Sequence, residues 1–131
     1  MTNDAVRLIR SGDGPAVVDI DLAAQLDVAK AEQVARAVRA EVDALAGRPF
    51  MLLLDTRKVT QASGDALQLL QGLEMDLAGL GLERIAHVVR FAGMVDTLKK
   101  EYRELGYPDL IGTFTDREQA MAFLAGTEPQ S

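Results

Sequence analysis

Short apolar stretches recur along the chain, and their length is that of β-strands rather than helices. Residues that favour turns bound each stretch, and the run "FMLLLDT" has no polar side chain until its aspartate. A short, wholly apolar run is typical of a central parallel strand that is covered on both faces. The pattern predicts five strands, at 6–10, 16–21, 50–56, 84–91 and 111–115.

The second predicted strand alternates between apolar and acidic residues. Val18 and Ile20 fall on one side of it, and Asp19 and Asp21 fall on the other. Such alternation predicts a sheet with one face exposed to water at this edge. The turn "SGDGP" before it has the length of a hairpin loop, so we expect the first strand to run antiparallel to the second.

The segments between the strands carry apolar residues at three- and four-residue spacing, the period of amphipathic helices. Helices are predicted at 27–45, at 64–80, across 95–105 and in the segment "TDREQAMAFL". Gly47 and Pro49 end the first of them. Thr115 and Glu118 form a capping box at the start of the last.

The predicted order is β-β-α-β-α-β-α-β-α, which belongs to the α/β class. Strands that alternate with helices imply right-handed crossovers and a mostly parallel sheet of four or five strands with about four helices. The central strand is expected at 50–56, between the strands at 16–21 and 84–91. The 131 residues suit a single domain, 1–131, with an ordered core at about 5–125.

The composition excludes several kinds of site and partner. The chain has no cysteine, so it has neither disulfides nor thiolate metal ligands. Its formal charge of −6 opposes binding to nucleic acid or to an anionic bilayer, and no apolar run reaches the length of a membrane span. The first residues lack the pattern of a signal peptide. We expect a cytoplasmic protein with no cofactor, no metal and no stable membrane association.

The sequence gives little support for an enzymatic site, and we expect no catalytic activity. His87 is the single histidine and alternates with apolar residues of a predicted strand, so a hydrogen-bonded core or edge histidine is the favoured interpretation. No phosphate-binding loop, dinucleotide fingerprint or metal-spaced cluster is present. A hydrolase that uses Ser63 is the weakest alternative, because "QASGD" lacks the first glycine of the nucleophile elbow and nothing supplies a matched base.

Ser63 and Asp27 each stand where a helix is predicted to begin. Serine and aspartate are preferred N-caps, and Asp65 in the first turn after Ser63 complements the helix dipole. Asp55 ends the central strand, where α/β proteins place functional groups. A carboxylate that anchors a loop is an equally common role for an aspartate at that position.

Three stretches resemble STAS domains, the SpoIIAA-like fold of bacterial anti-sigma-factor antagonists. "IDLAAQLDVAKAEQV" (20–34) is similar to the family's opening, in which a strand leads into a Leu-Asp pair, here Leu26 and Asp27, and then the first helix. "FMLLLDTRKVTQASGDALQLL" (50–70) resembles the central signature, an apolar strand followed by Asp-Ser-Ser-Gly at the start of a helix. The segment 92–124 is similar to the family's last third.

The resemblance implies a switch that this chain lacks. In that family a partner kinase phosphorylates the first serine of Asp-Ser-Ser-Gly and so controls binding. Here Gln61 takes the place of the aspartate, Ala62 that of the phosphoacceptor, and Ser63 and Gly64 the last two positions. Ala62 has no hydroxyl to phosphorylate. Ser63 stays an alternative, shifted phosphosite, because a helix N-terminus attracts phosphate, but Asp65 opposes a second negative charge there.

The hypothesis is therefore a non-catalytic bacterial regulatory module that binds a protein, with an anti-sigma factor or a histidine-kinase-like regulator as the expected partner. The expected binding face consists of Asp27, Thr60, Gln61, Ala62, Ser63 and Gly64.

Two further expectations come from the apolar residues. A carrier of small apolar or lipid ligands, of the SpoIIAA-like/SEC14-like type, is the runner-up function, with a pocket between the sheet and the second and third helices. The same residues more readily fill a core. A homodimer is a further expectation, because one sheet face that the helices are expected to leave uncovered carries Val18, Ile20, Ile85, Val89 and Phe91. The alternative is that the terminal helix folds back and covers this face.

Overall fold

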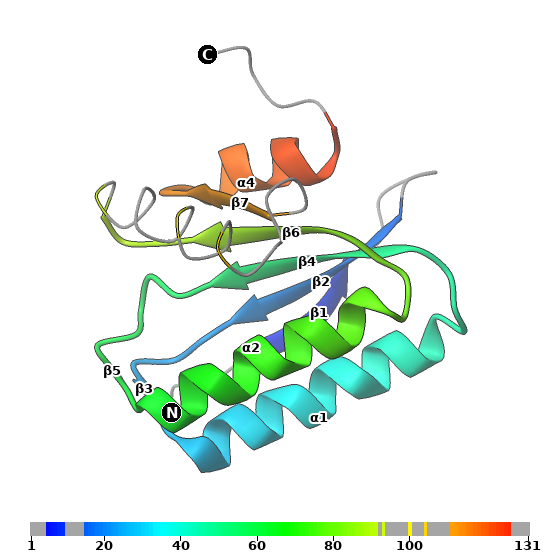
Figure 1. Cartoon of the computed structure of the whole chain (residues 1–131). Helices are drawn as coiled ribbons and strands as arrows, with labels where there is room; N and C mark the ends of the chain where they lie inside the picture. The colour runs from blue at the N-terminus through cyan, green and yellow to red at the C-terminus, as the bar shows by residue number, and fades with distance from the viewer. Residues whose placement is uncertain are drawn as a thin grey trace.

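The computed structural model describes residues 5–9, 15–91, 93, 100, 104 and 111–126, and within them a five-stranded sheet runs through the centre of the molecule (Figure 1). The strand order is β1-β2-β4-β6-β7. The strands are β1 (Ala5–Ile9), β2 (Ala16–Asp21), β4 (Phe50–Asp55), β6 (Leu82–Val88) and β7 (Ile111–Phe114). β1 pairs antiparallel with β2, and the other neighbours pair in parallel. The predicted topology, with β4 at the centre, is confirmed.

Helices α1 (Val28–Ala44) and α2 (Gly64–Ala78) lie side by side on one face of this sheet (Figure 1). Successive right-handed crossovers from β2 to β4 and from β4 to β6 advance in the same direction, so both helices fall on the same side. They bury a continuous apolar layer with the even-numbered residues of β2 and β4. Its members include Val18, Ile20, Leu52, Leu54, Val34, Val38, Leu73 and Leu77.

This arrangement corrects the prediction of an uncovered apolar face. Val18, Ile20 and Ile85 do share a face, but α1 and α2 cover it and all three are buried. Phe91 lies beyond the end of β6 and is 61% exposed, so it is not part of that layer. The covered face offers no dimer surface, and self-association by any other surface stays a prediction.

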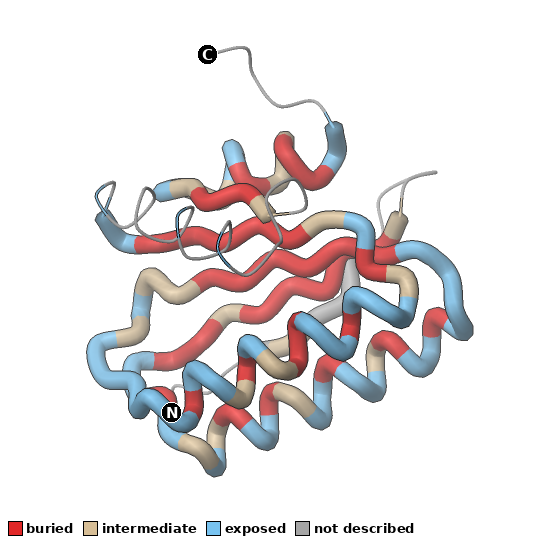
Figure 2. Tube along the Cα trace, viewed as in Figure 1, coloured by how far each residue is buried: buried red, intermediate tan, exposed pale blue. Residues whose placement is uncertain are grey.

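Helix α4 (Arg117–Leu124) covers the opposite face over β4, β6 and β7. Its Ala120, Phe123 and Leu124 pack against a second apolar cluster that includes Leu53 and Val88. The tube in Figure 2 shows the buried strands between the two helix layers. Asp19 and Asp21 point toward this side, and the prediction of a wet face is wrong there, because Asp19 is 0% exposed.

Most element boundaries lie within two residues of the predicted ones, and the clearest differences are at β6 and at the start of α4. β6 begins at Leu82 and ends at Val88, earlier at both ends than the predicted strand at 84–91. The N-cap of α4 is Asp116, whose carboxylate accepts a hydrogen bond from the Gln119 amide at 2.8 Å, so the predicted capping box that starts at Thr115 is wrong. The third predicted helix, at 95–105, lies outside the described residues apart from positions 100 and 104.

Candidate functional site

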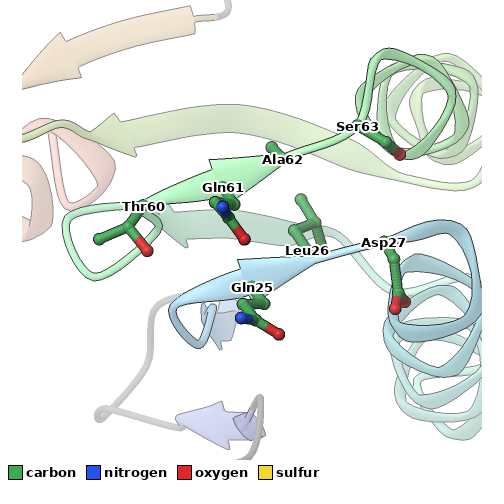
Figure 3. Close-up of a pocket in the computed structure, with 7 residues that line it drawn as sticks. All are labelled: Gln25, Leu26, Asp27, Thr60, Gln61, Ala62 and Ser63. Atoms are coloured by element: carbon green, nitrogen blue, oxygen red, sulfur yellow. The ribbon is translucent and has the colours of Figure 1, made fainter.

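A small two-stranded ribbon lies beyond the carboxyl ends of β2 and β4 (Figure 3). Strand β3 (Gln25–Leu26) pairs in parallel with β5 (Gln61–Ala62). Gln25 stands opposite Gln61, and Leu26 stands opposite Ala62. Each strand leads within two residues into a helix, so the ribbon joins the starts of α1 and α2.

Backbone hydrogen bonds hold the ribbon together. The carbonyl of Ala24 accepts hydrogen bonds from the amides of Thr60 and Gln61, at 2.7 and 3.1 Å, and from the Thr60 hydroxyl at 3.2 Å. The Ser63 amide donates to the Leu26 carbonyl at 3.1 Å. These bonds join two segments that are far apart in the sequence.

The two helix caps predicted from the sequence are confirmed. The Asp27 carboxylate accepts from the Lys30 amide at 2.8 Å, and the Ser63 hydroxyl accepts from the Ala66 amide at 3.1 Å. Both residues have the extended backbone that is usual for an N-cap. The Ser63 hydroxyl is therefore committed to satisfying a backbone N–H at the start of α2.

The ribbon and the caps line an open groove with a volume of about 590 Å³. It is lined by Gln25, Leu26, Asp27, Thr60, Gln61, Ala62 and Ser63. The structure thus brings Asp27 together with Thr60, Gln61, Ala62 and Ser63, as the sequence predicts. Gly64 is exposed and begins α2 outside this lining, with open space where a side chain would stand. Gln25 was missed, because its only signal is the pairing with Gln61 across the ribbon.

Comparisons with known proteins identify the fold. A scan against protein-family models finds no match, and a search of curated proteins finds no match. Among solved structures, an uncharacterised protein of the DUF3478 family with a SpoIIAA-like fold, from Shewanella loihica PV-4, matches this chain with a TM-score of 0.67. The two are 20% identical, and the match covers 93% of this chain and 94% of that one. The chain has a SpoIIAA-like fold. The groove between β3 and β5 is therefore a feature of a SpoIIAA-like domain.

Asp55 anchors the turn that connects the sheet of this SpoIIAA-like domain to the groove. Its buried carboxylate accepts hydrogen bonds from the Arg57 amide at 3.1 Å and from Nε and Nη2 of Arg57 at 3.0 and 2.9 Å. Arg117 adds a further bond from Nη1, at 3.2 Å. Burial acts to raise the pKa of Asp55, but the combined hydrogen bonds from Arg57 and Arg117 outweigh it, so the pKa lies below its usual value. The sequence left two roles open for Asp55, a functional group or a carboxylate that anchors a loop. These hydrogen bonds show that Asp55 anchors the loop.

His87 is a core residue, as the sequence favoured. Its Nε2 lies 3.0 Å from the Glu74 carboxylate, and both side chains are buried between β6 and α2. This pair lies in the layer between the sheet and α2, and neither residue lines the groove. Within the described part of the chain, no group of three or more histidine and acidic side chains has the arrangement of a metal site. No helix among the described residues is long and apolar enough to cross a membrane.

Proposed function

We propose that this chain is a non-catalytic bacterial regulatory module that binds a partner protein through the groove between β3 and β5. The observation that carries the proposal is the convergence of Asp27 and residues 60–63, from separate segments, on one open groove. An open, largely neutral groove suits contact with another chain better than enclosure of a small molecule. The partner we propose is an anti-sigma factor or a histidine-kinase-like regulator.

The proposal includes the loss of a phosphate switch at position 62. Ala62 is exposed on β5, where a kinase would reach a hydroxyl, but its side chain is a methyl group. Ser63 caps α2 through its hydroxyl, so phosphorylation there would remove a stabilising hydrogen bond and add charge beside Asp65. Binding is therefore constitutive, or is controlled by means other than phosphorylation.

The binding experiment uses a purified anti-sigma factor of the histidine-kinase-like class from the same genome, with titration calorimetry as the readout. Ala62→Arg places a large side chain in the groove and is expected to weaken binding about tenfold or more, as for a central interface position. The matched control is Ala37→Arg, because Ala37 is an exposed alanine of α1 that lies outside the groove lining. Equal affinity for Ala62→Arg and wild type contradicts the proposal.

The switch is tested with the family-type kinase and ATP, followed by intact-mass measurement. The wild-type chain is expected to gain no phosphate. The double variant Gln61→Asp, Ala62→Ser restores the Asp-Ser-Ser-Gly pattern and is expected to gain one. Adding Ser63→Ala to that double variant leaves the phosphate in place if position 62 is the acceptor. A stoichiometric phosphate on wild-type Ser63 overturns this part of the proposal and makes the domain a shifted-site switch.

A further inference from the structure

We propose that the docking surface continues from the groove onto a cationic rim, formed by Arg57, Lys58, Arg90 and Phe91, and that this rim takes an acidic segment of the partner protein that carries an apolar side chain. The inference rests on the proposed protein-binding function and names the chemistry of the partner. The rim is the turn after β4 together with the residues that follow β6.

Arg90 joins these two pieces through hydrogen bonds to backbone carbonyls. Its Nε and Nη2 donate to the Arg57 carbonyl at 2.9 and 2.7 Å, and Nη2 also donates to the Val59 carbonyl at 2.9 Å. The acceptors are neutral, and no carboxylate among the described residues pairs with Arg90. Its Nη1 makes no hydrogen bond within the described part of the chain. Arg90 is exposed, so an uncompensated guanidinium faces solvent.

The other two cations of the rim, Arg57 and Lys58, are each more exposed to solvent than the carboxylate that pairs with them. The Arg57 side chain is 39% exposed and its partner Asp55 is 4% exposed. The Lys58 side chain is 61% exposed and its partner Asp21, at 3.0 Å, is 25% exposed. Solvent therefore meets the positive groups first, although the chain as a whole carries a formal charge of −6.

Phe91 supplies an apolar contact beside these charges. At 61% it is the most exposed of the large apolar side chains in the described part of the chain. The Arg90 guanidinium carbon lies 5.9 Å from the centre of its ring, within the range of a cation–π contact. Arginine next to an exposed aromatic ring is a composition enriched at protein interfaces.

The rim is continuous with the groove. Arg90 binds the Val59 carbonyl, and the next residue, Thr60, lines the groove. A partner segment that fills the groove meets the cations at this end. Because the net charge of the chain opposes acidic partners, an acidic segment gains where it meets the rim cations, and this attraction orients the partner. The same net charge, with only three cations in the rim, disfavours nucleic acid and anionic membranes as occupants.

The first experiment maps binding by amide chemical shifts in a labelled sample at low salt. The probe is a synthetic acidic peptide that has one central tryptophan and glutamate at every second position on either side of it. The control peptide has glutamine in place of each glutamate. The acidic peptide is expected to shift the amides of residues 57–62, 90 and 91. The glutamine peptide is expected to bind at least fivefold more weakly. Equal binding of both peptides, or shifts confined to other surfaces, overturns the inference.

Charge-matched variants separate the rim from general electrostatics. Lys58→Glu and Arg36→Glu change the net charge equally, and both side chains are well exposed. Only Lys58→Glu is expected to weaken the acidic peptide, by about tenfold for a reversed rim charge. Phe91→Ser is expected to weaken it, whereas Met75→Ser, at an exposed apolar position on α2, is not. Equal effects within either pair contradict the inference.

Two further measurements decide the class of occupant and the link to the groove. In the first, the amide shifts are measured with a single-stranded oligonucleotide and with vesicles that contain phosphatidylserine. If either shifts the rim amides more strongly than the acidic peptide does, the proposal of an acidic protein segment is wrong. With the anti-sigma factor as partner, loss of binding in Ala62→Arg but not in Lys58→Glu means that the groove functions and the rim does not. Loss in neither variant means that the proposed function itself fails.

Discussion

On one face of the sheet, α1 and α2 bury a continuous apolar layer, whereas on the other face α4 buries a smaller apolar cluster together with charged groups. Asp19 is fully buried on the α4 face, and Arg117 reaches it from the first turn of α4 at 2.7 Å. The same guanidinium donates to Asp55 at 3.2 Å. Asp19 lies on β2 and Asp55 on β4, so one side chain joins α4 to two strands.

The difference separates two sources of stability. Apolar burial is non-directional and depends little on pH, so the α1/α2 layer is held by area and close packing. A buried ion pair loses much of its Coulomb attraction to desolvation, so the Arg117 contacts fix where α4 lies more than they add net stability. The α1/α2 layer also buries one ionisable pair, His87 and Glu74. The α4 layer differs in that one shared cation, Arg117, joins its helix to two strands of the sheet.

The largest expected effect is a cavity in the α1/α2 layer. Phe50 begins β4 and is fully buried there. Phe50→Ala is expected to lower the free energy of unfolding by about 3–5 kcal/mol. Urea denaturation at pH 7 and at pH 5 measures it, and the loss is expected to be equal at the two pH values. A loss that depends strongly on pH would break the comparison.

Removal of the shared guanidinium is the matching test on the α4 face. Arg117→Met keeps the aliphatic stem but removes the cation that Asp19 and Asp55 share, and is expected to cost about 2–4 kcal/mol because the arginine is partly exposed. Asp19→Asn in the Arg117→Met background is expected to recover part of this loss. If the double variant is no more stable than Arg117→Met, buried charge is not the cause.

Much of the apolar face follows from local patterns, and the charged face does not. The period of apolar residues predicts α1, α2 and the strands between them, and the preference of aspartate and serine for N-caps places Asp27 and Ser63. Acidic residues at alternate positions of β2 indicate that this side of the strand is exposed to solvent, unless a cation from elsewhere in the chain pairs with them. That cation, Arg117, comes 98 residues after Asp19, and no local rule connects the two.

The candidate site divides in the same way. The motif comparison predicts Asp27 and residues 60–64, of which only Gly64 lies outside the groove lining, because a signature near a strand end carries positional information. The ribbon itself has two residues in each strand, too few for any periodic signal. The place of Gln25 in the groove lining therefore follows only from its pairing with Gln61 across the ribbon, which the sequence does not reveal. Helix coverage of Val18 and Ile20 is likewise a consequence of crossover handedness and strand order, which alternation within one strand does not contain.

Acidity is expected to act on the α4 face through Asp55. Because folding lowers the pKa of Asp55, its contribution to stability is fully present above the ordinary pKa of 3.8 and is lost as the pH falls through the lower folded pKa. Asp55→Asn is expected to cost about 1.5–3 kcal/mol at pH 7, the range for hydrogen bonds to charged groups. Denaturation curves from pH 7 down to pH 3 are expected to show this difference shrinking. A difference that stays constant over that range contradicts the assignment.

The smallest effects come from the helix caps, which occur on both faces of the sheet. Ser63 caps α2 and Asp116 caps α4, each through a bond to the amide three residues on. Ser63→Ala and Asp116→Ala are each expected to cost about 1 kcal/mol, and Ser63→Asp to cost little because aspartate also caps.

Hydrogen exchange distinguishes the two caps where global stability does not. α4 has eight residues and buries three of them, so loss of its cap is expected to accelerate exchange throughout α4 while β4 stays protected. α2 has fifteen residues packed on the sheet, and loss of Ser63 is expected to affect only its first turn. If Asp116→Ala left exchange in α4 unchanged, the apolar cluster beneath α4 would hold that helix without its charged end, and the contrast between the two faces would be smaller than the buried aspartates imply.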